Sequence, residues 1–365
     1  MKVAIIIADI SLRAGTERAV CSLANNLAKE YEVTIISICS KQEQQNSYEL
    51  APTVEIYHLN TILTGNIVQK IYSRIRLILK LRKIVSDNKI DIIFSARRVM
   101  SFASLFLQKS CKKIACEHFN YNQAHWVSKL LRRVFYPKLD AVVLLTQRDA
   151  EKYKFVPENK RFVIPNSLSF TCDTPSNCEK KRIIALGRFS PQKGFDYLLQ
   201  TAVKLKKEIP DWHIDIFGSG DDETMLKDLA RKLQVDDFVT FNTPTKEVIK
   251  ELCNSGMYVM SSRYEGLPMV LIEAQECGLP IVSFDCPEGP SEVIHEGKDG
   301  FLVPLADTDA LAERIITLAK NEEMRKEFGR NAKINCKQFS PERVGEMWMD
   351  LIHKLTVNKE NKNEI

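Results

Sequence analysis

Two glutamates, Glu265 and Glu273, lie in a stretch that combines an apolar run, a glycine turn and a proline. The run 257–260 is typical of a strand, and Pro268 suits the first turn of a helix, where its missing N–H would be unpaired anyway. A carboxylate can accept two neighbouring hydroxyls, as sugars and ribose present them. The alternative is that Glu265 is a solvated loop residue and Glu273 a solvated helix residue, because glutamate is mostly exposed.

The helix start in this stretch suits an anion. Its free N–H groups and positive dipole end favour a phosphate, and Gly266 would let a ligand approach the backbone. We therefore expect the turn to bind the anionic part of a ligand, while the two glutamates bind its hydroxyls. The residues of this turn are Gly266, Leu267, Pro268, Met269 and Val270.

Two cations lie in a second strand-to-helix loop. The run 183–189 is of strand type, Arg188 lies near its end, and Lys193 precedes a helix candidate that extends to residue 209. Arg as a planar fork and Lys as a point charge are spaced to clamp a diphosphate. The alternative is a pair of surface cations, and the pair alone does not decide between the two interpretations.

Two further candidates lie in the first half of the chain. Gly15 is the only glycine in the loop 11–18, so the G-x-G-x-x-G pattern is missing and a nicotinamide cofactor is disfavoured. Gly15 could contact a ligand or only form a turn. His118 ends a strand candidate, and parallel sheets bind ligands at the carboxyl ends of their strands. We therefore expect His118 to face a ligand, although a lone histidine is more often a packed residue.

Apolar runs and helical patterns alternate along the whole chain. Strands that are continuously apolar and separated by helices favour parallel sheets covered on both faces. The expected strands are residues 3–8, 32–38, 54–59, 91–96, 113–118, 141–146, 183–189, 213–217, 238–242, 257–261, 280–285 and 301–304. The sequence thus predicts doubly wound α/β architecture.

The length of the chain predicts two domains. Its 365 residues exceed the ~250 to 300 at which a single core stops growing. A polar stretch at 170–180 interrupts the alternation of strands and helices. We expect an N-terminal domain over residues 1–167 and a second domain over 168–340, followed by a last helix that contains Trp348.

Composition limits the compartment and the partners. No apolar run approaches the ~20 residues that cross a bilayer, and the N-terminal run is followed by Asp9 rather than by a cleavage region. The ten cysteines form no C-x-x-C pair and no Cys/His cluster with metal-ligand spacing. We therefore expect free thiols in a reducing cytosol. The net charge of +5 is too small to argue for nucleic acid as a partner.

A basic helix candidate spans residues 67–85. At 100° per residue one face carries Ile67, Ile71, Ile75, Ile78 and Val85. Within this segment no acidic residue precedes Asp87. An anionic membrane surface or a polyphosphate is therefore a candidate ligand, and a solvated charged face is the alternative. The cations of this helix are Lys70, Arg74, Arg76, Lys80 and Lys83, and Lys129, Arg132 and Arg133 beside Trp126 form a second basic group.

Four motifs resemble those of family 4 retaining glycosyltransferases, which have the GT-B fold. They are GRFSPQKG at 187–194, SRYEGLPMVLIE at 262–273, ECGLPIV at 276–282 and DGFLVP at 299–304, and the resemblance covers essentially the whole chain. It implies two Rossmann-like domains that face each other across a cleft, with the helix at 341–357 crossing back to the N-terminal domain. It also implies transfer of a hexose or N-acetylhexosamine from a UDP-sugar, with retention of configuration.

The same resemblance assigns roles to the candidate residues. Glu273 holds the ribose hydroxyls, Glu265 holds the hexose hydroxyls, and Arg188 and Lys193 neutralise the departing diphosphate together with the amides near 267–270. His118 orients or polarises the sugar that is transferred in the cleft.

In the family, the position of Gly15 belongs to an N-terminal glycine loop, and the reaction needs no metal or cofactor beyond the nucleotide sugar. The one D-x-D motif, at 307–309, is expected to cap a helix rather than to bind a metal.

Within the family, the stretches 15–18, 117–118 and 285–290 resemble bacterial enzymes that extend lipid-linked oligosaccharides, capsules or exopolysaccharides. Some of these grip the pyrophosphate of an undecaprenyl-linked acceptor with a cationic helix, and the helix at 67–85 is the candidate here. We therefore expect a cytoplasmic enzyme, peripheral on the inner face of the plasma membrane. The alternative is a catalytically silent partner subunit that keeps the fold, since fold alone does not settle function.

Overall fold

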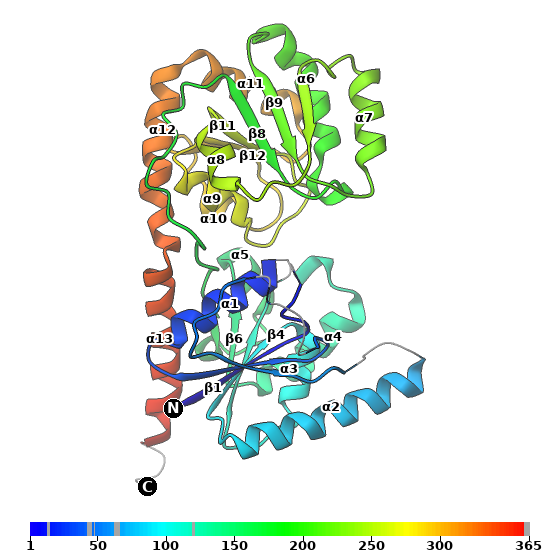
Figure 1. Ribbon diagram of the computed structural model, residues 1–365, viewed down its shortest axis with the longest axis vertical. Helices are drawn as coiled ribbons and strands as arrows, with labels where there is room; N and C mark the ends of the chain where they lie inside the picture. Colours follow the sequence, from blue (N-terminus) through cyan, green and yellow to red (C-terminus); the bar gives the residue numbers. More distant parts are fainter. Residues whose placement is uncertain (13–14, 42–45, 47, 62–65, 119–120, 361–365) are drawn as a thin grey trace. The chain divides into compact units, whose positions relative to one another are not determined.

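The computed structural model describes residues 1–360 except 13–14, 42–45, 47, 62–65 and 119–120. The chain forms two compact units, one of Met1–Ser169 with Pro341–Ile365 and one of Phe170–Ser340. Each unit is built around its own parallel β-sheet (Figure 1). The expected α/β class with two doubly wound domains is confirmed.

The first unit contains a seven-stranded sheet with the order β3-β2-β1-β4-β5-β6-β7. Its strands are β1 (Lys2–Ile7), β2 (Glu32–Ser37), β3 (Glu55–His58), β4 (Ile92–Ala96), β5 (Lys112–Cys116), β6 (Ala141–Leu144) and β7 (Arg161–Val163). The first six confirm the expected strands. The edge strand β7 was not expected, because its three residues are only partly buried and carry no continuous apolar pattern.

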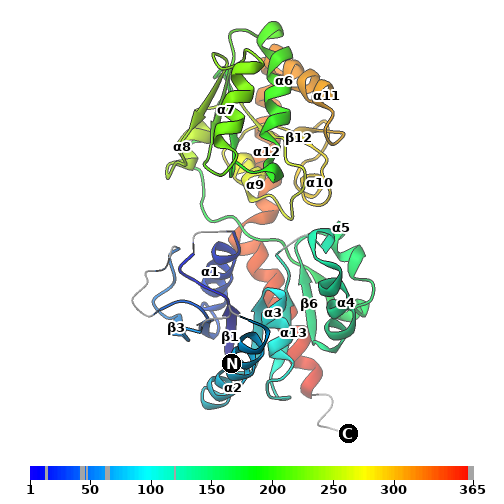
Figure 2. The ribbon, with the colours of Figure 1, turned by 90° about the vertical axis from the view of Figure 1, so that its right-hand side faces the viewer.

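Helices cover both faces of this sheet. They are α1 (Gly15–Leu27), α2 (Ile67–Asp87), α3 (Arg98–Ser104), α4 (Trp126–Phe135), α5 (Gln147–Ala150) and α13 (Pro341–Glu360). Ile5 packs in the core with α1 and α13, whereas its neighbour Ile6 packs with α2 and α3 on the other face. The helix α13, red in Figures 1 and 2, lies beside α1, and its Trp348 meets Phe94 edge-on at 5.5 Å. The helix α13 is therefore part of the core of the first unit.

The second unit contains a six-stranded sheet with the order β10-β9-β8-β11-β12-β13. Its strands are β8 (Arg182–Leu186), β9 (His213–Phe217), β10 (Val239–Asn242), β11 (Met257–Met260), β12 (Ile281–Phe284) and β13 (Gly300–Val303). Its helices are α6 (Phe195–Glu208), α7 (Glu223–Lys232), α8 (Val248–Cys253), α9 (Met269–Glu276), α10 (Pro290–Val293), α11 (Thr308–Lys320) and α12 (Glu322–Asn335). In Figure 2, α6 and α11 lie side by side, and both pack on the same core as β8 and β9.

The strand order of each sheet reverses at one place. The chain winds outward from β1 in one direction and from β4 in the other, and β8 and β11 repeat this arrangement in the second unit. Loops at the carboxyl ends of such a strand pair diverge and leave a crevice, which is where open α/β sheets bind ligands. In the second unit these two loops carry Arg188, Lys193 and Glu265.

The start of α11 tests the expected role of the D-x-D motif. Asp307 Oδ1 accepts a hydrogen bond from the Ala310 N–H at 2.9 Å, so the expected cap is confirmed for Asp307, whereas the Asp309 side chain is 84% exposed. Replacing a capping Asp by Ala typically costs ~1 kcal/mol. We expect Asp307→Ala to lower the free energy of unfolding by about that amount, and Asp309→Ala to change it by less than ~0.5 kcal/mol. Urea unfolding measures both, and equal losses would contradict the assignment.

Candidate active site

Hydrogen bonds join the loops that follow β8 and β11. The Arg263 backbone N–H donates to the Gln192 carbonyl at 2.8 Å, and the Gln192 side-chain amide donates to the Tyr264 carbonyl at 3.1 Å. The Ser261 hydroxyl donates to the Lys193 carbonyl at 3.1 Å. The two loops are therefore held as one surface, although their residues lie about seventy positions apart in the chain.

The Arg263 guanidinium strengthens the joint between these two loops. It forms two hydrogen bonds with the Asp196 carboxylate, at 2.8 and 2.7 Å, and lies 4.1 Å from the centroid of the Tyr197 ring. Gly194 allows the close approach of the loops, because its φ is +62° and an added Cβ would lie 2.1 Å from the Ser261 carbonyl oxygen. Only glycine fits there without moving the backbone.

Lys193 and Glu265 meet at the joint. Lys193 Nζ lies 2.7 Å from Glu265 Oε1, and the Ser262 hydroxyl donates to the same oxygen at 2.7 Å. Glu265 is 8% exposed, so the interpretation as a solvated loop residue is wrong. The lysine stem packs against Gly187, the residue before Arg188, so the two predicted cations come from adjoining parts of one loop surface.

A cavity of about 290 Å³ opens at the carboxyl ends of β8 and β9. Arg188, Val270 and Glu273 all line it, so residues that were predicted from two separate motifs share one site. Glu273 is 4% exposed, and its interpretation as a solvated helix residue is therefore wrong. Pro268 is the N-cap of α9 rather than its first helical residue, and the helix begins at Met269.

Sequence reasoning missed much of the cavity wall. The remaining lining residues are Leu186, Gly187, Phe217, Gly218, Ser219, Pro244, Thr245 and Val248. The glycine pair 218 and 220 was the available signal, and the structure explains Gly218: a Cβ there would lie 1.9 Å from the Gly187 carbonyl oxygen. The loops after β8 and β9 can approach this closely only because no side chain separates them.

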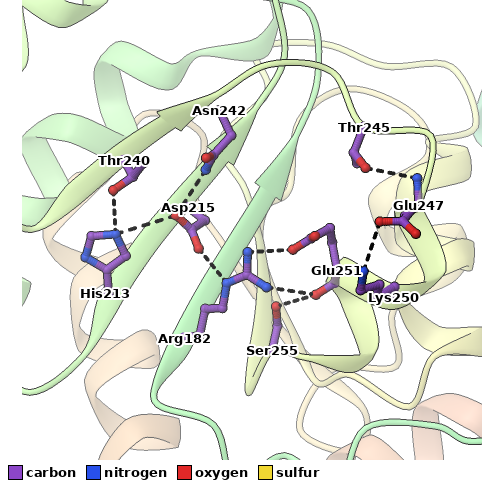
Figure 3. A network of polar contacts seen from close by, with 10 residues as sticks. All are labelled: Arg182, His213, Asp215, Thr240, Asn242, Thr245, Glu247, Lys250, Glu251 and Ser255. Carbon is purple, nitrogen blue, oxygen red and sulfur yellow. Dashed lines mark hydrogen bonds and ion pairs between the residues drawn. The ribbon is translucent and has the colours of Figure 1, made fainter.

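A polar network anchors α8, whose first residue Val248 lines the cavity (Figure 3). Arg182 Nη2 donates to Glu251 Oε2 at 2.8 Å, and its Nε donates to Asp215 on β9. Asn242 Nδ2 on β10 donates to Asp215 Oδ1 at 3.1 Å. One arginine thus ties this helix to three neighbouring strands.

In the first unit, His118 follows β5 at the carboxyl end of the sheet. Burial and, to a smaller extent, the positive charge of Arg97 lower its pKa to about 4. Its Nδ1 is buried and has no hydrogen-bond partner among the described residues. His118 is therefore neutral at pH 7, and it lines a cavity of about 20 Å³, enough for roughly one water molecule.

Arg97 and Glu17 form a second group near the strand reversal, which sequence reasoning did not identify. Arg97 follows β4 with φ of 104°, a conformation that is strained for a residue with a side chain. Its Nη2 lies 3.5 Å from Glu17 Oε1, and Glu17 is fully buried in α1. Gly15 begins this helix and is exposed, with no atom within 4 Å of an added Cβ, so packing does not require glycine there.

The structure corrects the assignment of Arg132 to the second basic group. Its guanidinium is buried, and its Nη2 donates to Glu117 Oε2 at 2.6 Å. The Tyr136 hydroxyl donates to the other oxygen of the same carboxylate. Arg132 therefore fixes the end of β5 just before His118, whereas Arg133 on the same helix is exposed.

The structure also corrects the apolar face of α2. Leu77, Leu81 and Val85 are buried against the sheet, whereas Ile71 and Ile75 are 54% and 55% exposed. Among the described residues, no helix combines the length and apolarity that a membrane span requires.

The cations of α2 differ in their surroundings. Arg74, Arg76 and Lys83 are exposed. Lys80 is partly buried, and its Nζ donates to the Leu59 carbonyl at 3.2 Å. The Lys70 side chain lies outside the described residues.

Comparison with known proteins identifies the family of both halves of the chain. The model described as Glycosyltransferase Family 4 matches residues 13–171, and the model described as Glycosyl transferases group 1 matches residues 173–335. An uncharacterized glycosyltransferase of Haemophilus influenzae is 31% identical over 359 residues, which cover 96% of this chain and 99% of that protein.

Another relative, from Campylobacter jejuni, has a name that states a specific activity. It is called GalNAc-alpha-(1->4)-GalNAc-alpha-(1->3)-diNAcBac-PP-undecaprenol alpha-1,4-N-acetyl-D-galactosaminyltransferase, and it is 31% identical over 96% of this chain and 98% of its own length. Among solved structures, a mutant of Staphylococcus aureus TarM in complex with fondaparinux, alpha-GlcNAc-glycerol and UDP matches with a TM-score of 0.78 and 16% identity, over 96% of this chain and 99% of that one. The chain belongs to the family 4 glycosyltransferases and has their GT-B fold.

Proposed function

We propose that this protein transfers a hexose or N-acetylhexosamine from a UDP-sugar to a hydroxyl of a lipid-linked saccharide, with retention of configuration. The observation that carries the proposal is the pair of the partly buried Lys193 and the buried Glu265, held where the strand order reverses and beside a cavity lined by Arg188 and Glu273. This arrangement supplies groups for each part of a nucleotide sugar.

The cavity suits the nucleoside part of the donor. Its wall combines apolar side chains such as Leu186 and Val248 with one carboxylate, that of Glu273, which can accept the two ribose hydroxyls. Arg188 and Lys193 then lie beside the diphosphate, and the N-terminus of α9 adds its positive dipole end. The UDP in the TarM structure supports uridine as the nucleoside, because the two proteins share the fold.

The reaction breaks the bond between the anomeric carbon and the phosphate oxygen, and the electron pair stays on UDP. The acceptor oxygen bonds to the anomeric carbon on the same face, and its proton passes to the departing phosphate. Negative charge therefore grows on the diphosphate in the transition state, where Arg188 and Lys193 stabilise it most. This chemistry needs no metal, and neutral His118 contributes a hydrogen bond to the sugar rather than a charge.

The acceptor side of the proposal rests on α2. Its exposed apolar side chains, Ile71 and Ile75 among them, accompany exposed cations. A surface of this kind suits the headgroup region of an anionic membrane or the pyrophosphate of a lipid carrier. The undecaprenol in the name of the Campylobacter relative supports a lipid-linked acceptor. We place the enzyme peripherally on the cytoplasmic face of the plasma membrane.

The donor site can be tested by substitution. We expect Lys193→Ala to lower kcat by about 100-fold or more, as loss of one group that stabilises transition-state charge does. Glu265→Gln should also lower kcat, because it releases the Lys193 ammonium from its fixed position. Glu273→Gln should instead raise the Kd for UDP, because ribose binding contributes before the chemical step. The measurements are sugar transfer and the thermal shift with UDP.

Lys204→Ala is the matched control for Lys193→Ala, since Lys204 is a partly exposed lysine on α6 that pairs with Glu313. A fully active Lys193→Ala, Glu265→Gln double variant would overturn the proposal. If the wild type is stabilised by UDP but transfers no sugar from any UDP-sugar to any acceptor, the silent-partner alternative holds.

The neutral state of His118 predicts a pH dependence of stability. Its folded pKa lies below the ordinary 6.5, so between about pH 6.5 and pH 4 the unfolded chain takes up the proton and folding is destabilised as the pH falls. His118→Gln should flatten this part of the stability profile, as measured by urea unfolding at several pH values. His353→Gln, at an exposed position on α13, should leave the profile unchanged. An identical profile for wild type and His118→Gln would refute the assignment.

The charge of α2 predicts membrane affinity. Each cation near an anionic surface contributes about 1 kcal/mol, so we expect Arg74→Glu, Arg76→Glu and Lys83→Glu together to weaken binding to anionic vesicles by roughly 100-fold or more. Lys80 is left intact because its ammonium bonds the Leu59 carbonyl. Reversal of three other exposed lysines of this unit, Lys29, Lys41 and Lys109, is the control with the same change in net charge. Equal losses in both triple variants would show that only net charge matters.

A further inference from the structure

Three cysteines of the second unit converge although they are far apart in sequence. The Sγ atoms of Cys172, Cys253 and Cys277 all lie within 4.8 Å of one another, and those of Cys172 and Cys253 are 3.3 Å apart. Cys172 precedes β8, Cys253 ends α8, and Cys277 follows α9. The sequence spacing of these cysteines gave no sign that they converge in space.

The cluster is mostly buried but can be reached. Cys172 and Cys277 are 5% and 0% exposed, whereas Cys253 is partly exposed and opens a path from solvent. Burial raises the pKa of Cys253 to about 11 and that of Cys277 further. The thiols of Cys253 and Cys277 are therefore protonated at neutral pH, which makes these two poor nucleophiles for forming a disulfide. A thiophilic cation deprotonates its thiol ligands directly.

Neighbouring groups hold the cluster and supply positive charge. The Lys333 Nζ donates to the Cys172 carbonyl at 2.9 Å and to Glu276 Oε1 at 2.6 Å. The same carboxylate oxygen accepts the Cys172 backbone N–H at 2.8 Å. The charge of Lys333 lowers the pKa of Cys253 in opposition to burial. An ammonium in this place partly offsets the negative charge that three thiolates would bring.

We propose that Cys172, Cys253 and Cys277 bind a thiophilic divalent cation of the zinc type. Binding replaces three S–H protons by three metal–sulfur bonds, so that one Zn²⁺ releases three H⁺ and leaves a site of net charge −1. Zn–S bonds of about 2.3 Å in a tetrahedron place sulfurs about 3.8 Å apart. The observed separations, from 3.3 Å to below 4.8 Å, need only small side-chain rotations to reach this value. Water completes the coordination.

The site would act on the stability of the second unit. It joins the segment before β8 to the ends of α8 and α9, and these two helices supply Val248, Val270 and Glu273 to the donor cavity. A bound cation thus restrains two walls of that cavity without taking part in sugar transfer.

The proposal is tested with the full-length protein, reduced and freed of metal by a chelator. Zn²⁺ titration against a chromophoric chelator should give one site with Kd below about 1 μM, release of three protons per metal and a higher melting temperature. Cd²⁺ should give thiolate-to-metal absorption bands. We expect Cys172→Ser, Cys253→Ser and Cys277→Ser each to weaken Zn²⁺ binding by about 100-fold. Loss of a residue that only supports a metal ligand already lowers metal affinity by up to about 100-fold.

Cys39→Ser is the matched control, because Cys39 is a partly buried thiol in the other unit and should not affect binding. Cys253→Ser decides the matter if a buried variant fails to fold, since this position is partly exposed. Zn²⁺ affinity that is unchanged in Cys253→Ser, or a reduced wild type that takes up no metal, overturns the proposal. A Cys172–Cys253 disulfide as the only reaction of these thiols would overturn it as well.

Discussion

The proposed donor site depends on the ion pair between Lys193 and Glu265. Withdrawing two charges from water is costly, and the attraction between them offsets this cost only where the geometry is good and further hydrogen bonds are made. The 2.7 Å contact and the Ser262 hydroxyl meet these conditions. The joint between the two loops, with Gly194 and Arg263 at its centre, is what keeps that geometry fixed.

The sequence was most informative where a signal is local. Continuous apolar runs identified twelve strands, because a strand of a parallel sheet is buried on both faces and reads the same in any such sheet. Arg188, Lys193 and Glu265 were expected to lie together because their loops follow strands, Glu273 lies on the helix that follows one of these loops, and strand ends of one sheet meet at one edge. The strand β7 escaped because its three residues lie at the edge and are only partly buried.

The failures concern contacts that sequence spacing does not encode. Periodicity placed Ile71 and Ile75 on an apolar face of α2, but it could not say where the sheet beneath the helix ends. Arg132 was grouped with its exposed neighbours, because the sequence does not show that it is hydrogen-bonded to Glu117, fifteen residues earlier. The three clustered cysteines come from three separate elements, so no spacing motif could have revealed them. Each error arises from a partner distant in the chain.

The Lys193–Glu265 pair also bears on the catalysis that we propose. A cation that stabilises a departing diphosphate must be fixed before the charge appears, since reorganising it during the reaction would add to the barrier. In the proposed role of Lys193, Glu265 supplies this restraint, because it holds the ammonium at a position set by both loops. Under the proposed function, a nucleotide sugar brings negative phosphates to that ammonium and hydroxyls to the carboxylate. Both groups of the pair then gain ligand partners, so the pair can loosen without leaving a buried charge unpaired.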